Sequence, residues 1–228
     1  MIVTRPREWG MLMGVLEDIG ARRVFLVGCG QCATVGKTGG EEEVAQAAQR
    51  LETEGMQVTG SMIGESSCHQ ANMGVRLRER KAELDSADAV IVFACGAGTQ
   101  TIAELTGLPV LPGAESVFLG NVIRQGRFEE RCQMCGDCVL DTTAGICPVT
   151  TCPKGLLNGP CGGMWDGKCE VLAEKECVHV RIVQRLASQG RAQGDTMSPK
   201  DHSAKQRPGA VDLRAERSRR SQAEGGPA

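Results

Sequence analysis

Eight of the twelve cysteines of this 228-residue chain fall in one stretch of 46 residues, from Cys132 to Cys177. The stretch contains a single aromatic residue, Trp165, and no apolar run long enough to build a core. Burial of so little hydrophobic surface cannot offset the conformational entropy lost on folding, so the segment needs cross-links. Cysteine is the only residue present in sufficient number to provide them.

The choice between disulfides and metal depends on the redox compartment. The first residues, MIVTRPREWGMLMGVL, contain neither the apolar h-region nor the small-residue cleavage site of a signal peptide. No run of about 18 apolar residues could span a membrane. We therefore expect a cytoplasmic chain whose thiols stay reduced, and clustered cysteines in such a chain favour metal binding.

The spacing of the first cysteines favours an iron–sulfur cluster over zinc. Zinc sites commonly use two C-x2-C knuckles, whereas this stretch opens with a triple, Cys132-x2-Cys135-x2-Cys138, which begins the bacterial ferredoxin run. The gap to the next cysteine is eight residues here instead of the ferredoxin three, and two Cys-Pro steps follow, at Cys147 and Cys152. Eight cysteines fit two [4Fe–4S] clusters, or one cluster and one zinc ion, and their spacing leaves the division open. The eight are Cys132, Cys135, Cys138, Cys147, Cys152, Cys161, Cys169 and Cys177.

The first part of the chain alternates predicted strands and helices with short connections. Apolar runs predict strands at 23–28, 56–63, 88–94 and 108–113. Apolar periodicity and end signals predict helices at 6–20, 41–55, 71–87 and 99–107. Such alternation is typical of a parallel sheet covered by helices. We therefore predict an open α/β domain with a four-stranded parallel sheet, flavodoxin- or Rossmann-like, over 1–125.

A small cysteine-rich iron–sulfur or zinc domain is predicted to follow, over 126–189. A linking helix at 114–131 would connect the two domains, with the boundary near Gly126, and a further helix is predicted at 170–189. From Gly190 the chain is rich in Arg, Ser, Gly and Gln without periodicity, which predicts a disordered tail over 190–228. The formal net charge of −2 gives no indication of binding to nucleic acid or to membranes.

The remaining four cysteines follow three successive predicted strands, and they are Cys29, Cys32, Cys68 and Cys95. Because the carboxyl ends of parallel strands share one edge of a sheet, we expect these thiols to converge where open α/β folds bind ligands. Nearby glycines would let the backbone approach closely and donate N–H groups to cluster sulfurs. We interpret the four as a third metal site, a [4Fe–4S] cluster.

Several alternatives compete with this interpretation. A thioredoxin-type redox pair at Cys29 and Cys32 would leave the other two thiols unexplained. A P-loop is excluded, because five residues separate Gly30 from Gly36 where that motif has four. Cys95 alone could be an inert buried thiol. His69 and His179 could be ligands, but twelve cysteines already supply three sets of four, which favours a packing role for both histidines.

No constellation for substrate chemistry is visible. The chain has no Ser-His-Asp set, no paired carboxylates and no G-x-G-x-x-G after its first predicted parallel strand, and it is short for a TIM barrel with a second domain. All-cysteine clusters generally have low reduction potentials. The sequence therefore favours a protein that passes single electrons to a partner.

Two parts of the sequence resemble a known enzyme system. The segment from Cys132 to about Leu186, with its NGPCGG motif, resembles the methylenetetrahydrofolate reductase C-terminal cysteine-rich family. The segments VGCGQCATVGKTGG and VFACGAGTQT resemble the small iron–sulfur subunit of the acetogen-type methylenetetrahydrofolate reductase. Together they cover about residues 1–190. His179 departs from the pattern, because a larger aromatic residue is expected there, and this bears on packing only.

The resemblance implies a non-catalytic iron–sulfur subunit of an oxidoreductase complex. Its partner would be a flavin-containing TIM-barrel subunit that reduces 5,10-methylenetetrahydrofolate to 5-methyltetrahydrofolate in the reductive acetyl-CoA pathway. The N-terminal four cysteines would bind one cluster and the eight later ones the C-terminal sites, with zinc as an option there. The donor stays open between ferredoxin, NADH through a further subunit, and a disulfide-reductase-like complex. The competing hypothesis is a structural or assembly subunit that binds zinc without a redox role.

Overall fold

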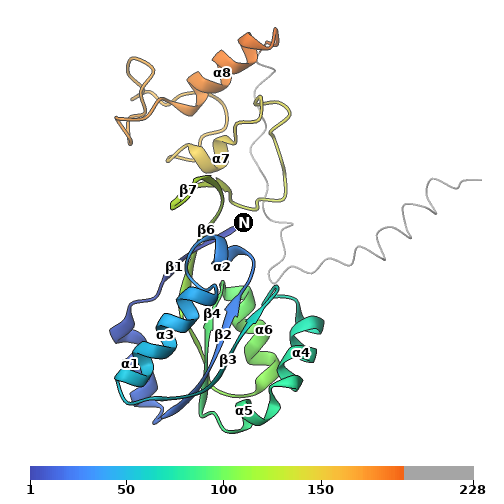
Figure 1. The fold of residues 1–228 in the computed structure, drawn as a ribbon. Helices are drawn as coiled ribbons and strands as arrows, with labels where there is room; N and C mark the ends of the chain where they lie inside the picture. Colours follow the sequence, from blue (N-terminus) through green and yellow to red (C-terminus); the bar gives the residue numbers. More distant parts are fainter. Residues whose placement is uncertain (193–228) are drawn as a thin grey trace, which may run out of the picture. The chain divides into compact units, whose positions relative to one another are not determined.

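The computed structural model of the chain describes residues 1–192 (Figure 1). These residues form two compact units, of which the first consists of Met1–Met134 and Cys147–Gly155. The second consists of Cys135–Ile146 and the described residues from Leu156 on. The predicted boundary near Gly126 lies in a hairpin turn inside the first unit. The predicted tail, apart from its first three residues, lies outside the described part of the chain.

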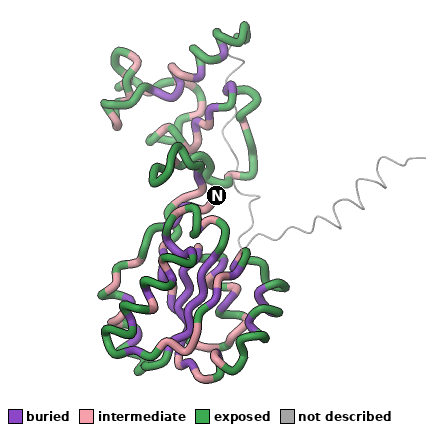
Figure 2. Tube along the Cα trace, viewed as in Figure 1, coloured by how far each residue is buried: buried purple, intermediate pink, exposed green. Residues whose placement is uncertain are grey.

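A four-stranded parallel sheet forms the centre of the first unit, as the sequence predicts. Its strands, in the spatial order β3-β2-β4-β5, are β3 (Gln57–Gly64), β2 (Arg23–Cys29), β4 (Ala89–Phe93) and β5 (Val110–Pro112). The two central strands are buried on both faces (Figure 2). This double burial explains why both read as continuous apolar runs instead of alternating ones.

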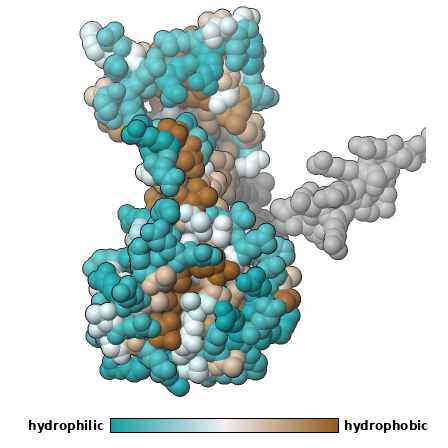
Figure 3. All heavy atoms as spheres, viewed as in Figure 1, coloured by the Kyte–Doolittle hydropathy of each residue, from teal (hydrophilic) through white to brown (hydrophobic). Residues whose placement is uncertain are grey.

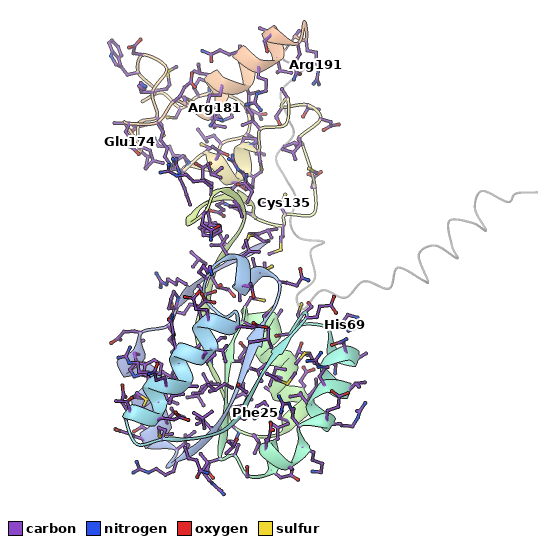
Figure 4. All side chains as sticks on the ribbon, viewed as in Figure 1. Phe25, His69, Cys135, Glu174, Arg181 and Arg191 are labelled. Atoms are coloured by element: carbon purple, nitrogen blue, oxygen red, sulfur yellow. The ribbon has the colours of Figure 1, made fainter. Side chains whose placement is uncertain are left out.

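Helices cover the two faces of this sheet (Figure 1). On one face α1 (Trp9–Asp18) and α3 (Glu41–Thr53) pack against side chains such as Val24 and Leu26. The opposite face, with Phe25 (Figure 4) and Val27, is covered by α4 (Gln70–Glu79), α5 (Lys81–Asp85) and α6 (Gly96–Thr106). Successive residues of β2 therefore enter different cores, as the two-residue period of a strand requires. Hydrophilic side chains cover most of the visible outer surface (Figure 3).

The helices differ from the predicted ones at their ends. The helix predicted at 6–20 begins only at Trp9, because Pro6 ends a preceding strand. The helix predicted at 71–87 is divided into α4 and α5 at Arg80, whose backbone leaves the helical region (φ −106°, ψ 19°). The helix predicted at 99–107 begins three residues earlier, at Gly96. A four-residue helix that was not predicted, α2 (Cys32–Val35), follows β2.

The prediction of a linking helix at 114–131 is wrong. These residues form the hairpin of β6 (Ala114–Arg124) and β7 (Arg127–Cys132), and β6 also pairs antiparallel with β1 (Ile2–Pro6). Residues Gln125 and Gly126 make the two-residue turn, in which Gly126 takes a φ of 74° that favours glycine. The decisive partner of β6 is a strand more than 100 residues away in the sequence, so local periodicity could not reveal it.

The second unit consists mainly of loops and one helix, α8 (Val178–Ser188). Of the helix predicted at 170–189, only the second half is helical in the structure. Its first half joins a short antiparallel ladder instead, with bridges between Trp165 and Lys168 and between Lys168 and Glu176. The short helix α7 (Pro148–Thr151) belongs to the first unit, where it lies against β7. Within the described residues, no helix is both long and apolar enough to cross a membrane.

Candidate metal centre

The structure places four cysteines at the carboxyl edge of the parallel sheet. Cys29 is the last residue of β2, and Cys32 begins α2 after it. Cys68 lies in the loop that follows β3, and Cys95 is the N-cap of α6, directly after β4. Because β2 lies between β3 and β4 in the sheet, the three loops that carry these thiols are neighbours.

A buried serine holds the Cys68 loop against its two neighbours. Ser67 is fully buried, and its Oγ donates a hydrogen bond of 2.9 Å to the carbonyl oxygen of Gly28, next to Cys29. On the side of α6, a Cβ atom at Gly98 would lie 3.1 Å from the Cβ of Ser67. The N–H of Gly30 also donates to the carbonyl of Gly64 at 2.8 Å. The loops after β2 and β3 are therefore joined by hydrogen bonds to backbone carbonyls next to the cysteines, and Ser67 also lies close to α6.

A second set of contacts fixes the backbone of Cys29. Its N–H donates to the carbonyl of Gly39 at 2.9 Å, and its own carbonyl accepts from the Oγ1 of Thr34 at 2.8 Å. Gly39 in turn lies so close to β4 that a Cβ on it would overlap the carbonyl oxygen of Phe93. Sequence reasoning missed Ser67 and Gly39 as positioning residues. Their motifs, GESSCH and KTGG, have the composition of ordinary loops, so no local signal identified them.

The thiols differ in exposure but are all free. Cys29 is buried, Cys32 and Cys95 are half-buried, and Cys68 is exposed with its Sγ 3.3 Å from the Oγ of Ser66. Among the described residues, no group of three or more His, Cys, Asp or Glu side chains converges closely enough to hold a metal ion. The edge thus carries the donor set of an all-cysteine site on adjacent loops, which fits a cluster in its chemistry. In the structure, the four thiols of Cys29, Cys32, Cys68 and Cys95 do not converge on one point.

The two histidines have structural partners. His69 is the N-cap of α4 (Figure 4), and its Nδ1 accepts a hydrogen bond of 3.2 Å from the N–H of Asn72. His179, in the second unit, is 3% exposed, and its Nε2 lies 3.0 Å from the carbonyl oxygen of Leu156. Burial lowers the pKa of His179, and the hydrogen bond to Leu156 partly opposes this effect. Both positions agree with a packing or capping role.

We expect His69→Ala to weaken the fold without changing metal content. The substitution removes the acceptor for the third N–H of α4, and loss of a helix cap costs about 1 kcal/mol. Chemical denaturation should report that loss, and metal analysis of the anaerobically purified protein should give the same metal content as the wild type. A drop in bound metal in a folded His69→Ala protein would identify the imidazole as a ligand and refute the capping role.

The eight later cysteines are divided between the two units. Three belong to the first unit: Cys132 ends β7, while Cys147 and Cys152 cap the two ends of α7. The Sγ of Cys132 accepts a hydrogen bond of 3.2 Å from the N–H of Met134, the kind of donor that a thiolate ligand receives. The ferredoxin-like triple is therefore split, because Cys135 (Figure 4) and Cys138 lie in the second unit.

Three further cysteines surround the ladder of the second unit. The N–H of Cys169 donates to the carbonyl of Lys175 at 2.9 Å, and that of Cys177 donates to Gly167 at 2.7 Å. These pairings put Cys169 and Cys177 at diagonal positions on one face of the ladder. The Sγ of Cys161 lies 3.2 Å from the Oε2 of Glu170. The structure thus orders backbone around each of these cysteines, although no disulfide joins them.

Residues 111–203 match the model of a family described as "Methylene-tetrahydrofolate reductase C terminal". This segment is therefore similar to that C-terminal family, and the similarity is confined to the matched residues. The matched residues make up less than half of the chain and include all eight cysteines from Cys132 on. They begin within β5 of the first unit, so the match runs through the antiparallel hairpin into the second unit.

Comparison with solved structures found arylmalonate decarboxylase, with a TM-score of 0.34, 18% identity and coverage of 45% of this chain and 44% of that one. An unliganded form of arylmalonate decarboxylase matches with a TM-score of 0.32, 18% identity and 46% coverage of each chain. The chain thus spans less than half of these enzymes, and likeness at this level says nothing about its chemistry. A comparison with curated proteins found no match.

Proposed function

We propose that this protein is an electron-transfer subunit of a methylenetetrahydrofolate reductase complex. It would relay electrons through [4Fe–4S] clusters to a flavin-containing catalytic subunit that reduces 5,10-methylenetetrahydrofolate to 5-methyltetrahydrofolate. The observation that carries the proposal is the pairing of two features. One is the family match over the eight later cysteines, and the other is the set of four cysteines at the carboxyl edge of the sheet.

The N-terminal four cysteines would hold one cluster, and the later eight would hold one or two further metal sites. When bound, such clusters supply one-electron transfer, usually at low potential. The chain's own contribution at the sheet edge is positional. Contacts of Ser67 and Gly39 hold the three thiol-bearing loops together, and burial of Cys29 keeps water from one side of the edge. Cys95 is the N-cap of the eleven-residue helix α6 and so lies at the end of the helix where the dipole is positive.

A structural role with zinc is the second candidate. The gap of eight residues from Cys138 to Cys147 departs from a ferredoxin run, and eight cysteines are also the donor set of two four-cysteine zinc sites. In that case the chain would organise the complex without carrying electrons. The two candidates differ in their metal content and in whether that metal can be reduced.

Anaerobic co-purification with the flavin-bearing partner tests the proposal. We expect roughly eight to twelve irons per chain, at four per cluster, with matching sulfide, and an EPR signal from the protein reduced with dithionite. Zinc in place of one C-terminal cluster would give the lower iron value. Zinc alone, with no reducible cluster, would rule out electron transfer and leave the structural role.

A further inference from the structure

A basic cleft opens between α1 and α3 of the first unit. Its volume is about 280 Å³, close to the lower end of the range for small-ligand sites. It is lined by the end of β1, by one face of α3, by the loop after α2 and by the ends of β4 and β5. All of these elements belong to the first unit, and none of the twelve cysteines lines the cleft.

Three cations and one carboxylate line the cleft: Arg7, Lys37, Arg50 and Glu43. The Oε2 of Glu43 accepts a hydrogen bond of 2.8 Å from the N–H of Gly40 at the start of α3. The other two carboxylates nearby are also paired: Lys37 contacts Glu42 at 3.3 Å, and Arg50 contacts Glu54 at 3.3 Å.

Arg7 is the lining cation for which no salt bridge is found among the described residues. Its Nε is buried and has no hydrogen-bond partner among the described residues. Its backbone is nevertheless fixed, since its N–H donates to the carbonyl of Gly113 at 3.1 Å. A guanidinium donor that is removed from water without a partner is costly, and native proteins almost always satisfy such groups. Arg7 as a whole is half-buried and lines the cleft, so its guanidinium offers a positive charge to a ligand bound there.

The rest of the lining is mostly apolar, with Thr38 and Gln46 as its uncharged polar members. Trp9, Leu12 and Phe93 line the cleft. The indole of Trp9 is held on two sides, because its Nε1 donates to Glu54 at 2.7 Å and the Arg50 guanidinium lies 4.2 Å above its ring. A ligand that fills this space needs an apolar body as well as an oxyanion for Arg7. One unpaired cation matches a monoanion better than a doubly charged phosphate.

We propose that this cleft binds a small organic acid, whose carboxylate pairs with Arg7 and whose aliphatic or aromatic body packs on Trp9. The site goes beyond the proposed electron transfer, because it uses none of the cysteines. Sequence reasoning did not find it, since its residues come from segments far apart in the chain and none belongs to a recognisable motif.

Titration of the full chain, purified anaerobically with its metals, tests this site. The chain has two tryptophans, so a Trp165→Phe background leaves Trp9 as the sole indole reporter. Cyclohexanecarboxylate is the probe, because it absorbs no light at the wavelengths used and carries one charge. It should change the Trp9 emission saturably, with a Kd on the order of 1 mM. Cyclohexanecarboxamide, its neutral isostere, and inorganic phosphate, which lacks the apolar body, should bind at least about tenfold more weakly.

Arg7→Gln in the same background should weaken cyclohexanecarboxylate binding about tenfold or more. Arg22→Gln is the matched control, because Arg22 is an exposed arginine of the same unit that does not line the cleft, and its affinity should stay within about twofold. Should Arg7→Gln fail to fold, Lys37→Asn keeps the test open. Lys37 is exposed and has a φ of 55°, which asparagine tolerates, and its loss should weaken binding about threefold.

Three results would overturn the proposal. They are the absence of a saturable change with cyclohexanecarboxylate, equal affinity for the carboxamide, and an unchanged affinity in the folded Arg7→Gln protein or, if that variant is unfolded, in Lys37→Asn. Because the readout is Trp9 emission, it is independent of electron transfer. A failed iron analysis would therefore leave this site standing, and a failed titration would leave the electron-transfer proposal standing.

Discussion

If the chain carries electrons as proposed, replacing Cys95 by serine should reduce electron delivery from a physiological donor to the flavin of the proposed partner by more than about a hundredfold. The estimate exceeds the 10–100-fold loss that is typical for residues that only orient a metal ligand. A serine hydroxyl does not replace a cluster thiolate at neutral pH, so the site at the sheet edge would lose one of its four donors. An artificial dye that reduces the flavin directly should support the wild-type rate, because that route bypasses this chain.

The fold of the Cys95→Ser protein should remain intact. Cys95 is the N-cap of α6 with an extended backbone (φ −71°, ψ 167°) and makes no side-chain capping bond. Serine is among the preferred residues at this position, so the helix should be as stable as before or slightly more stable. Loss of activity in this variant would therefore report loss of the thiol and not unfolding, which a thermal melt monitored by circular dichroism would verify.

Ala97→Ser is the matched control for this experiment. Ala97 is exposed in the first turn of the same helix, so the change adds a hydroxyl nearby without removing a thiol. Its donor-linked and dye-linked rates should both equal those of the wild type. Undiminished donor-linked activity in Cys95→Ser would contradict a redox role for the sheet edge and favour the structural candidate.

Gly39→Ala should destabilise the first unit by about 3 kcal/mol or more, the upper part of the range for overpacking. The added Cβ would meet the backbone oxygen and carbon of Phe93, and backbone at the end of a central strand cannot move aside. At roughly 2–4 °C per kcal/mol for a protein of this size, the melting temperature should fall by about 6–12 °C. Because the carbonyl of Gly39 also accepts the N–H of Cys29, the proposed N-terminal metal site should lose occupancy as well.

Gly14→Ala provides a control with the opposite sign. Gly14 lies inside α1, and a Cβ there would meet nothing within 4 Å. Alanine inside a helix is favoured over glycine by about 1 kcal/mol, so this variant should melt at a higher temperature than the wild type. A Gly39→Ala protein that melts within a degree or two of the wild type would show that the contact with Phe93 can relax.

The sequence was sufficient for the parallel sheet because its signals are local. After the exposed Arg23 that begins β2, the runs at β2 and β4 contain no charged residue, as expected for strands buried on both faces, and the amphipathic segments between them identify the crossover helices. Once that order is known, the positions of Cys29, Cys68 and Cys95 follow, because each lies at or within four residues of the end of a strand and parallel strands end at one edge.

The antiparallel hairpin could not be predicted in the same way. Residues 114–131 are largely exposed, with Val117, Val122 and Ile123 among the exposed apolar side chains, so no buried face imposed a two-residue period. The strand conformation of these residues depends on pairing with β1, which lies more than 100 residues earlier in the sequence. The same limit applies to the basic cleft, which exists only because Arg7, Lys37 and Arg50 meet in space.

The cysteine-rich stretch shows both what the sequence alone predicts and what only the tertiary structure decides. From the sequence alone it was clear that residues 132–177 lack the apolar surface for a core of their own and carry enough thiols to be cross-linked by metal. Only the tertiary structure decided that Cys132, Cys147 and Cys152 belong with the first unit and Cys135, Cys138, Cys161, Cys169 and Cys177 with the second. The physical reason is that spacing along a chain fixes which ligands are available, whereas the packing of β7 against α7 and the ladder at Lys168 fix which elements hold the backbone around them.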